Sequence, residues 1–142
     1  MEPTDFLKTA ELLKSQSEEA HLRTSAGRSY YTAFLFFREH FKELGLQKTK
    51  QPNREIHAFV IQCLQFSNVT EYVKYAQYIR DLQQVREDAD YHIEKEFTQN
   101  DAEDAFAKVK TLISDYRDKI TPEKKKLFYD NAFEFAKMKD WI

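Results

Sequence analysis

The feature that most constrains the fold is a hydrophobic stripe that recurs at helical spacing between residues 30 and 44. Five residues, three or four positions apart, make up this stripe: Tyr30, Phe34, Phe37, Phe41 and Leu44. This spacing places all five side chains on one face of an α-helix, whereas a strand would divide them between two faces. Gly45 follows the stripe, where glycine commonly ends a helix because it tolerates a positive φ.

Residues that interrupt helices are scarce along the whole chain. Only two of the 142 residues are glycine and three are proline, too few to punctuate a many-stranded sheet. The hydrophobic periodicity predicts six helices: one from an N-cap at Thr4, one through 30–44, then 56–64, 71–90, 102–116 and 122–141. We therefore predict an all-α fold. An up-and-down bundle of four to five helices spans residues 1–120, and residues 121–142 form a C-terminal helical extension of the same domain.

Two of the predicted helices begin with recognisable capping sequences. Thr98-Gln-Asn-Asp101 has the form of a capping box in which aspartate replaces the usual glutamate. Thr121-Pro122 places an N-cap threonine directly before a proline at the first helical position. These sequences predict where the fifth and sixth helices start.

Composition and charge restrict the class of protein. The net charge of −2 gives no general attraction to nucleic acid, so such binding needs a local basic patch. Cys63 is the only cysteine, and its place in an apolar helical stripe predicts an inert core residue. The N-terminus lacks the pattern of a signal peptide, and the most apolar stretch, residues 30–37, is too short to span a bilayer. We expect a cytoplasmic protein without membrane association.

Two stretches carry more than helical periodicity. The first is residues 25–38, with Tyr30-Tyr31-x-x-Phe34 at its centre, and the second is residues 82–92, with Arg86-x-x-Ala-Asp-Tyr91. In this order they resemble the HEPN domain (higher eukaryotes and prokaryotes nucleotide-binding), over about residues 4–118. The resemblance implies a four- or five-helix bundle, commonly a homodimer, that binds RNA or a nucleotide.

The resemblance also implies two different activities. Catalytic HEPN proteins are metal-independent endoribonucleases, often toxins or phage-defence effectors, that use an arginine followed by four to six residues and a histidine. Arg86 and His92 are separated by five residues. Many relatives with Ala-Asp-Tyr lack this histidine and are not known to be catalytic. The alternative is a non-catalytic interaction module that recruits a partner protein, such as a cognate nucleotidyltransferase acting as an antitoxin.

RNA cleavage without a metal requires an acid, a base and a cation, and the same stretch offers candidates for each. Histidine suits proton transfer near neutral pH, and the planar guanidinium of arginine suits phosphate. We therefore expect Arg86 to bind phosphate, His92 to act as the acid or base, and Asp90 to orient Arg86. A two-fold dimer would supply the second proton carrier. We expect no metal and no cofactor, because the chain has only one Glu-x-x-His sequence, at Glu18, and a di-iron centre needs two.

The same residues also have a purely structural interpretation. Arg86 and Asp90, four positions apart, would form an exposed ion pair on one helix face. Arg86 and His92 point about 120° apart on a continuous helix, so they converge only if the helix ends or bends near Tyr91. His92 would then lie at a helix C-terminus, where a positive charge is mildly favoured.

Further candidates for nucleic-acid binding lie outside this pair. Tyr91 would stack on a base, or else pack in a groove, and Arg28 would line that groove or face solvent together with His40. Lys124, Lys125 and Lys126 form a basic run that contacts phosphate or belongs to a solvated face. The aromatic residues of the last helix must be buried, either on the bundle or on another chain.

Overall fold

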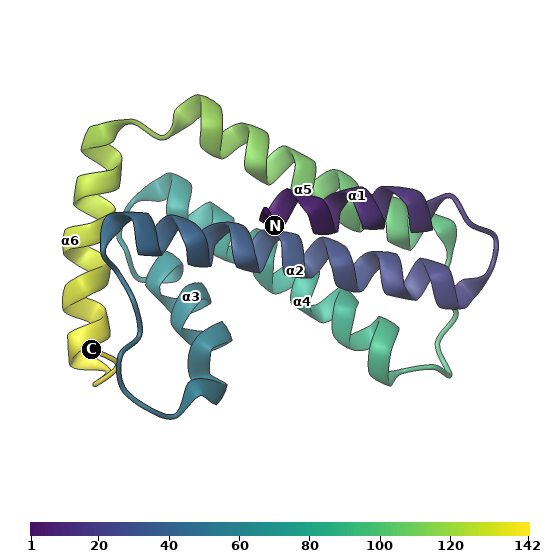
Figure 1. Cartoon of the computed structure of the whole chain (residues 1–142), viewed down its shortest axis with the longest axis horizontal. Coiled ribbons are helices and arrows are strands. Elements are labelled where there is room, and N and C mark those ends of the chain that lie inside the picture. Colours follow the sequence, from purple (N-terminus) through teal and green to yellow (C-terminus); the bar gives the residue numbers. More distant parts are fainter. The chain divides into compact units, whose positions relative to one another are not determined.

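The structure is a computed structural model that describes residues 1–142, and it contains helices and no strand (Figure 1). The helices are α1 (Pro3–Lys14), α2 (Glu19–Leu44), α3 (Ile56–Gln65), α4 (Thr70–Tyr91), α5 (Gln99–Lys119) and α6 (Pro122–Met138), with a short 3-10 helix, η1 (Asn53–Glu55), before α3. The predicted all-α helical bundle is therefore confirmed.

The chain forms two compact units, each built from two separate stretches of sequence. Unit 1 contains residues 1–36 and 78–114, and unit 2 contains residues 37–77 and 115–142. The three long helices α2, α4 and α5 contribute to both units, so each of them supplies side chains to two cores.

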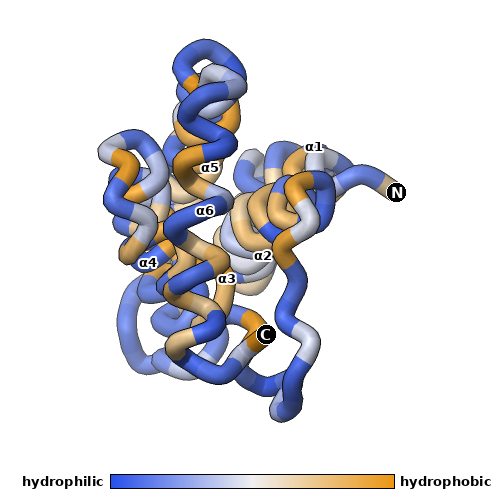
Figure 2. The backbone as a smooth tube through the Cα atoms, turned by 90° about the vertical axis from the view of Figure 1, so that its left-hand side faces the viewer, coloured by the Kyte–Doolittle hydropathy of each residue, from blue (hydrophilic) through white to orange (hydrophobic).

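In unit 1, α1 lies alongside the N-terminal part of α2 (Figure 1). Small residues on α2 allow this approach: the fully buried Ser25 donates a hydrogen bond from Oγ to the carbonyl oxygen of Ala10, at 2.7 Å. The remaining large core residues of unit 1 come from four segments: Leu22, Tyr30, Phe34, Ile79, Leu82, Phe97, Phe106, Val109, Leu112 and Ile113. Along α5, hydrophobic residues alternate with hydrophilic ones (Figure 2), as expected for a helix with one buried face.

Aromatic rings dominate the core of unit 2. Phe128 of α6 stacks on Tyr72 of α4, with ring centroids 4.0 Å apart, and both side chains are fully buried. Trp141, which follows α6, is buried and donates a hydrogen bond from Nε1 to Glu55 Oε2, at 2.7 Å. Two aromatic residues of the C-terminal segment are thus buried on their own chain, while Phe133 and Phe135 are half-buried.

The structure places His40 in the core of unit 2, so the expectation that it faces solvent is wrong. His40 is only 4% exposed, with Nδ1 2.7 Å from the Tyr116 hydroxyl and Nε2 3.0 Å from the Tyr72 hydroxyl. A neutral imidazole has one donor and one acceptor nitrogen, so two hydroxyls can satisfy it. Burial, with the positive charge of Lys125 as a lesser cause, lowers the pKa of His40 to about 4.

Three helix ends follow the capping sequences, and the start of α1 does not. Gly45 has φ +86° and closes α2 with a hydrogen bond from the Leu46 amide to the Phe41 carbonyl, at 2.8 Å. Thr98 and Asp101 form the reciprocal capping box at α5, and the Thr121 hydroxyl accepts from the Lys124 amide at α6. The N-cap of α1 is Glu2 rather than Thr4, because Pro3 already occupies the first helical position.

No helix combines the length and the apolar character that crossing a bilayer requires. Cys63 is fully buried in α3, and burial raises the pKa of its thiol to about 12. This environment suppresses the reactive thiolate, in agreement with a core role.

Candidate functional site

Arg86 lies on α4 in unit 1 and is surrounded by tyrosine rings. Its guanidinium carbon is 6.0 Å from the ring centroid of Tyr30, 5.5 Å from that of Tyr31 and 5.9 Å from that of Tyr91. The negative faces of aromatic rings attract a cation at such distances. The rings therefore hold the guanidinium in place without neutralising its charge.

Asp90 is the only carboxylate paired with Arg86. Its Oδ2 lies 3.0 Å from Arg86 Nε, which is the i,i+4 ion pair expected from the spacing. The N–H is nevertheless not directed at this oxygen, and the buried Nε forms no hydrogen bond. The attraction is therefore mainly Coulombic, and Asp90 accepts no hydrogen bond from Nε.

Arg28 on α2 lies on the same tyrosine as Arg86. Its guanidinium carbon is 5.7 Å from the Tyr31 centroid and 5.3 Å from the Phe6 centroid, and no carboxylate pairs with it. We call this group the arginine–tyrosine cluster: Arg28, Tyr30, Tyr31, Arg86 and Tyr91. It brings together three residues that the sequence singled out for nucleic-acid contact, namely Arg28, Arg86 and Tyr91.

The electrostatics of the cluster favour an anion. Each guanidinium has five N–H donors and remains charged under all ordinary conditions, while the single carboxylate of Asp90 offsets one of the two charges. Tyr30 remains a neutral phenol, because burial raises its pKa against the opposing effect of Arg86. Planar guanidinium groups with free donors suit the oxygens of a phosphate.

Tyr91 is the exposed member of the cluster. It is the last residue of α4, and its side chain is 68% exposed. The following Ile93 is 79% exposed. A large ring in this position offers a stacking surface next to the two cations.

His92 lies just beyond α4 and does not join the cluster. The helix ends at Tyr91, but the His92 amide still donates to the Asp88 carbonyl at 3.1 Å, so the backbone keeps its helical course. The imidazole Nδ1 lies 3.3 Å from Glu94 Oε1, and no contact links it to Arg86 or Asp90. The spacing of Arg86 and His92 therefore does not assemble an acid–base pair within one chain.

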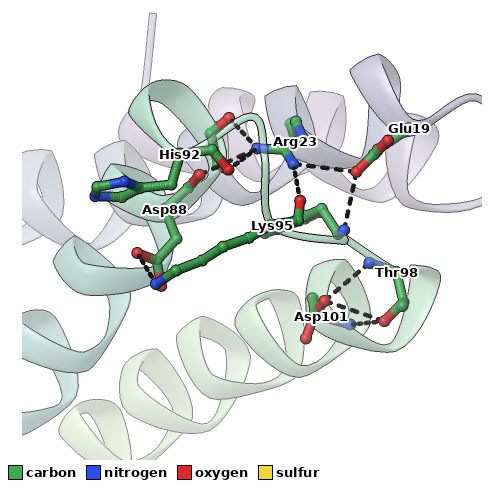
Figure 3. A network of polar contacts seen from close by, with 9 residues as sticks. Glu19, Arg23, Asp88, His92, Lys95, Thr98 and Asp101 are labelled. Atoms are coloured by element: carbon green, nitrogen blue, oxygen red, sulfur yellow. Dashed lines mark hydrogen bonds and ion pairs between the residues drawn. The ribbon is translucent and has the colours of Figure 1, made fainter.

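Arg23 of α2 is the best-connected side chain near the site, and nothing in its local sequence distinguishes it. Nη1 donates to the carbonyls of Asp88, Ala89 and His92, at 3.0, 2.8 and 3.3 Å. Nη2 donates to Glu19 Oε1, at 3.1 Å, and to the Lys95 carbonyl. Figure 3 shows the guanidinium among these acceptors, with the His92 ring directed away from it.

Glu19 completes the anchoring of the segment between α4 and α5. Its Oε1 also accepts the Phe97 amide, at 2.9 Å. Hydrogen bonds, first from Arg23 and then from the Phe97 backbone, lower the pKa of Glu19. The only indirect sequence signal for this arrangement is that α4 has no basic residue in its last turn, so its C-terminal carbonyls need a partner from elsewhere.

The lysine run lies in unit 2 and is largely paired with carboxylates. Lys124 Nζ is 3.1 Å from Glu71 Oε2, and Lys126 Nζ is 3.1 Å from Asp130 Oδ2. Lys125 is half-buried and forms no ion pair. These pairings favour the interpretation of residues 124–126 as a solvated face.

A groove of about 250 Å³ between α4 and α5 in unit 1 has the opposite charge character. Five carboxylates and two lysines line it, and two of the carboxylates pair with the lysines: Asp81 with Lys108 and Asp88 with Lys95. The excess negative charge disfavours phosphate there. No group of three or more histidine, cysteine, aspartate or glutamate side chains is arranged to hold a metal ion.

Comparison with known proteins adds no relative from which a function could be transferred. The chain matches no protein-family model, no curated protein sequence and no solved structure.

Proposed function

We propose that this chain is a HEPN-like helical domain that binds RNA or a nucleotide at the arginine–tyrosine cluster. The observation that supports this most directly is the pair of guanidinium groups that share the ring of Tyr31. Arg28 forms no ion pair with a carboxylate, and Arg86 pairs with Asp90 alone. An anionic ligand would balance the excess positive charge of the two guanidinium groups.

The ligand would contact the cluster through two kinds of interaction. Its phosphate oxygens would accept hydrogen bonds from Arg28 and Arg86, which supply charge and orientation. A base would stack on the exposed ring of Tyr91, an interaction open to any base because each has a π face. Phosphate and base lie next to each other in a nucleotide, as do Arg86 and Tyr91 in the cluster.

Endoribonuclease activity is the less supported part of this proposal. Cleavage needs a proton carrier at the phosphate that Arg86 holds, whereas the His92 ring pairs with Glu94. A homodimer, or a movement of residues 92–94 on binding RNA, would have to bring an imidazole to the phosphate. The cluster as it stands supports binding, and cleavage requires that rearrangement in addition.

The binding claim is tested by fluorescence anisotropy with a short labelled single-stranded RNA. Arg28→Ala and Arg86→Ala should each weaken binding about tenfold or more, the loss of hydrogen bonds to a charged group. Arg117→Ala is the matched control, because it removes the same charge from an exposed position on α5. Equal affinity for the wild type and all three variants would contradict the proposal.

The cleavage claim is tested with the same RNA in the presence of a metal chelator. RNA fragments that appear with the wild type, but with neither Arg86→Ala nor His92→Ala, would support an endoribonuclease. Equal nicking by all three proteins would identify the activity as a contaminant. If the wild type binds the RNA but leaves it intact, the chain is an RNA-binding domain without nuclease activity.

Recruitment of a partner protein is the second candidate function. Phe66 is 51% exposed although it stacks on Phe135, with ring centroids 4.9 Å apart. Exposed apolar surface of this kind is typical of contact surfaces. The candidate partner is a nucleotidyltransferase encoded by a neighbouring gene. Co-purification that is lost with Phe66→Ser would support this function, and no complex with the wild type would exclude that partner.

A further inference from the structure

We propose that Arg23 is a positioning residue of the arginine–tyrosine cluster. It holds the end of α4 and the segment after it, residues 88–97, so that Tyr91 keeps its place beside Arg86. This inference rests on the proposed function, because it concerns the geometry of that binding site. Arg23 itself does not contact the proposed ligand.

Arg23 supplies two carbonyl oxygens at the end of α4 with hydrogen-bond donors from another helix. The last four carbonyls of a helix receive no hydrogen bond from within the helix, and α4 has no basic residue in its last turn to supply one. The Asp88 carbonyl accepts from the His92 amide as well. Arg23 reaches across from α2 and donates to the carbonyls of Asp88 and Ala89. A cation in this position also interacts favourably with the negative end of the helix dipole.

Beyond Arg23, the segment after α4 is fixed to other elements by the Lys95–Asp88 ion pair and by the hydrogen bond from the Phe97 amide to Glu19. Residues 91–96 are all exposed, so their side chains contribute little packing. Arg23 binds the carbonyls of His92 and Lys95, and its guanidinium carbon lies 5.4 Å from the ring centroid of the buried Phe97. Figure 3 shows how one guanidinium connects the helix end, the segment and Glu19. Without it, the carbonyls of His92 and Lys95 would lose the side chain that ties them to α2.

Only an arginine can hold all these partners at once. Its two Nη groups are fixed in one plane and serve five acceptors, whereas a lysine ammonium is a single point with three donors. The side chain of Arg23 is only 11% exposed, which leaves water little access to the guanidinium itself. Arg23→Lys should therefore free the segment while preserving the positive charge.

A mobile Tyr91 would weaken ligand binding, because the ligand would have to order the segment on binding. We expect Arg23→Lys to raise the Kd for the labelled RNA about tenfold and to speed amide hydrogen exchange at His92, Lys95 and Phe97. Arg117→Lys, the same substitution at an exposed site, should change neither.

A double-mutant cycle with Tyr91→Ala separates positioning from a general loss of structure. If Arg23 acts through Tyr91, Arg23→Lys should weaken binding much less in the Tyr91→Ala background than in the wild type. A general structural role would give the same fold-change in both backgrounds, and this result would overturn the inference. If Arg23→Lys fails to fold, Glu19→Gln removes only the charge of one Arg23 partner and enters the same cycle, with a smaller expected loss.

The outcomes distinguish the inference from the proposed function. A wild type that binds no RNA refutes the proposed function, and the inference with it. A wild type that binds, with unchanged affinity in Arg23→Lys and a segment that exchanges faster, refutes the inference alone. Weaker binding together with the non-additive cycle supports both.

Discussion

His40 should make the stability of the protein depend on pH in a range where most carboxylates do not titrate. The pKa of a solvated histidine, 6.5, falls to about 4 in the fold because the imidazole is buried, with a lesser effect of Lys125. As the pH falls below 6.5, the unfolded chain binds this proton first. The free energy of unfolding therefore decreases with falling pH down to about 4, and it is unaffected by His40 above pH 6.5.

The magnitude follows from the size of the pKa shift. A full shift of this size corresponds to about 3 kcal/mol once both states are protonated. At about pH 5 the folded histidine is still mostly neutral and the unfolded one is charged, so about 2 kcal/mol of stability is lost relative to neutral pH. This loss is a large fraction of the stability of a small domain.

Urea denaturation at neutral pH and at about pH 5 measures this effect. His40→Gln lacks the titrating group and should lose about 2 kcal/mol less than the wild type between the two conditions, although it is less stable overall because its contacts with Tyr72 and Tyr116 change. His92→Gln, which removes an exposed imidazole, is the matched control and should behave as the wild type does. The same pH dependence in the wild type and His40→Gln would refute the reasoning.

Three further predictions concern the core and the helix ends. Cys63 should react with a thiol reagent only after the protein is unfolded in urea, because burial raises its pKa to about 12 and blocks access; rapid reaction of the native protein would contradict this. Gly45→Ala should destabilise the protein by about 1 kcal/mol because of its positive φ, whereas Gly27→Ala within α2, where an added Cβ meets nothing within 4 Å, should be neutral or stabilising in the same denaturation assay. Thr121→Ala should cost about 1 kcal/mol through loss of its hydrogen bond with the Lys124 amide, and Thr121→Ser should retain most of it; equal loss in both would show that the cap is not responsible.

Local signals in the sequence identified the six helices and several of their ends, but not the N-cap of α1 at Glu2 or the start of α2 at Glu19. The stripe from Tyr30 to Leu44, the glycine at 45 and the capping sequences at Thr98 and Thr121 all describe interactions between residues a few positions apart. The Gly45 turn and the caps at Thr98 and Thr121 are present in the structure as predicted. The sequence did not indicate that α2, α4 and α5 each contribute side chains to two cores. Periodicity identifies the buried face of a helix but not the helices that pack against it.

The misjudged and overlooked residues have partners far away in the sequence. His40 is polar and adjacent to the stripe, and it is buried because Tyr72 and Tyr116, 32 and 76 positions away, supply hydroxyls. Arg23 binds backbone carbonyls 65 to 72 positions away, and a carbonyl leaves no trace in the residue type. Likewise, the shared contact of Arg28 and Arg86 with Tyr31 depends on how α2 and α4 pack.

The salt dependence of RNA binding tests the central claim most directly. A ligand phosphate held by arginine releases counterions, so the slope of log Kd against log salt reports the number of such contacts, at about 0.7 per phosphate of a single strand. We expect the double variant Arg28→Gln/Arg86→Gln to bind more weakly, with a slope shallower by about 1.4. The same affinity and slope in the wild type and the double variant would contradict the assignment of the arginine–tyrosine cluster as the binding site.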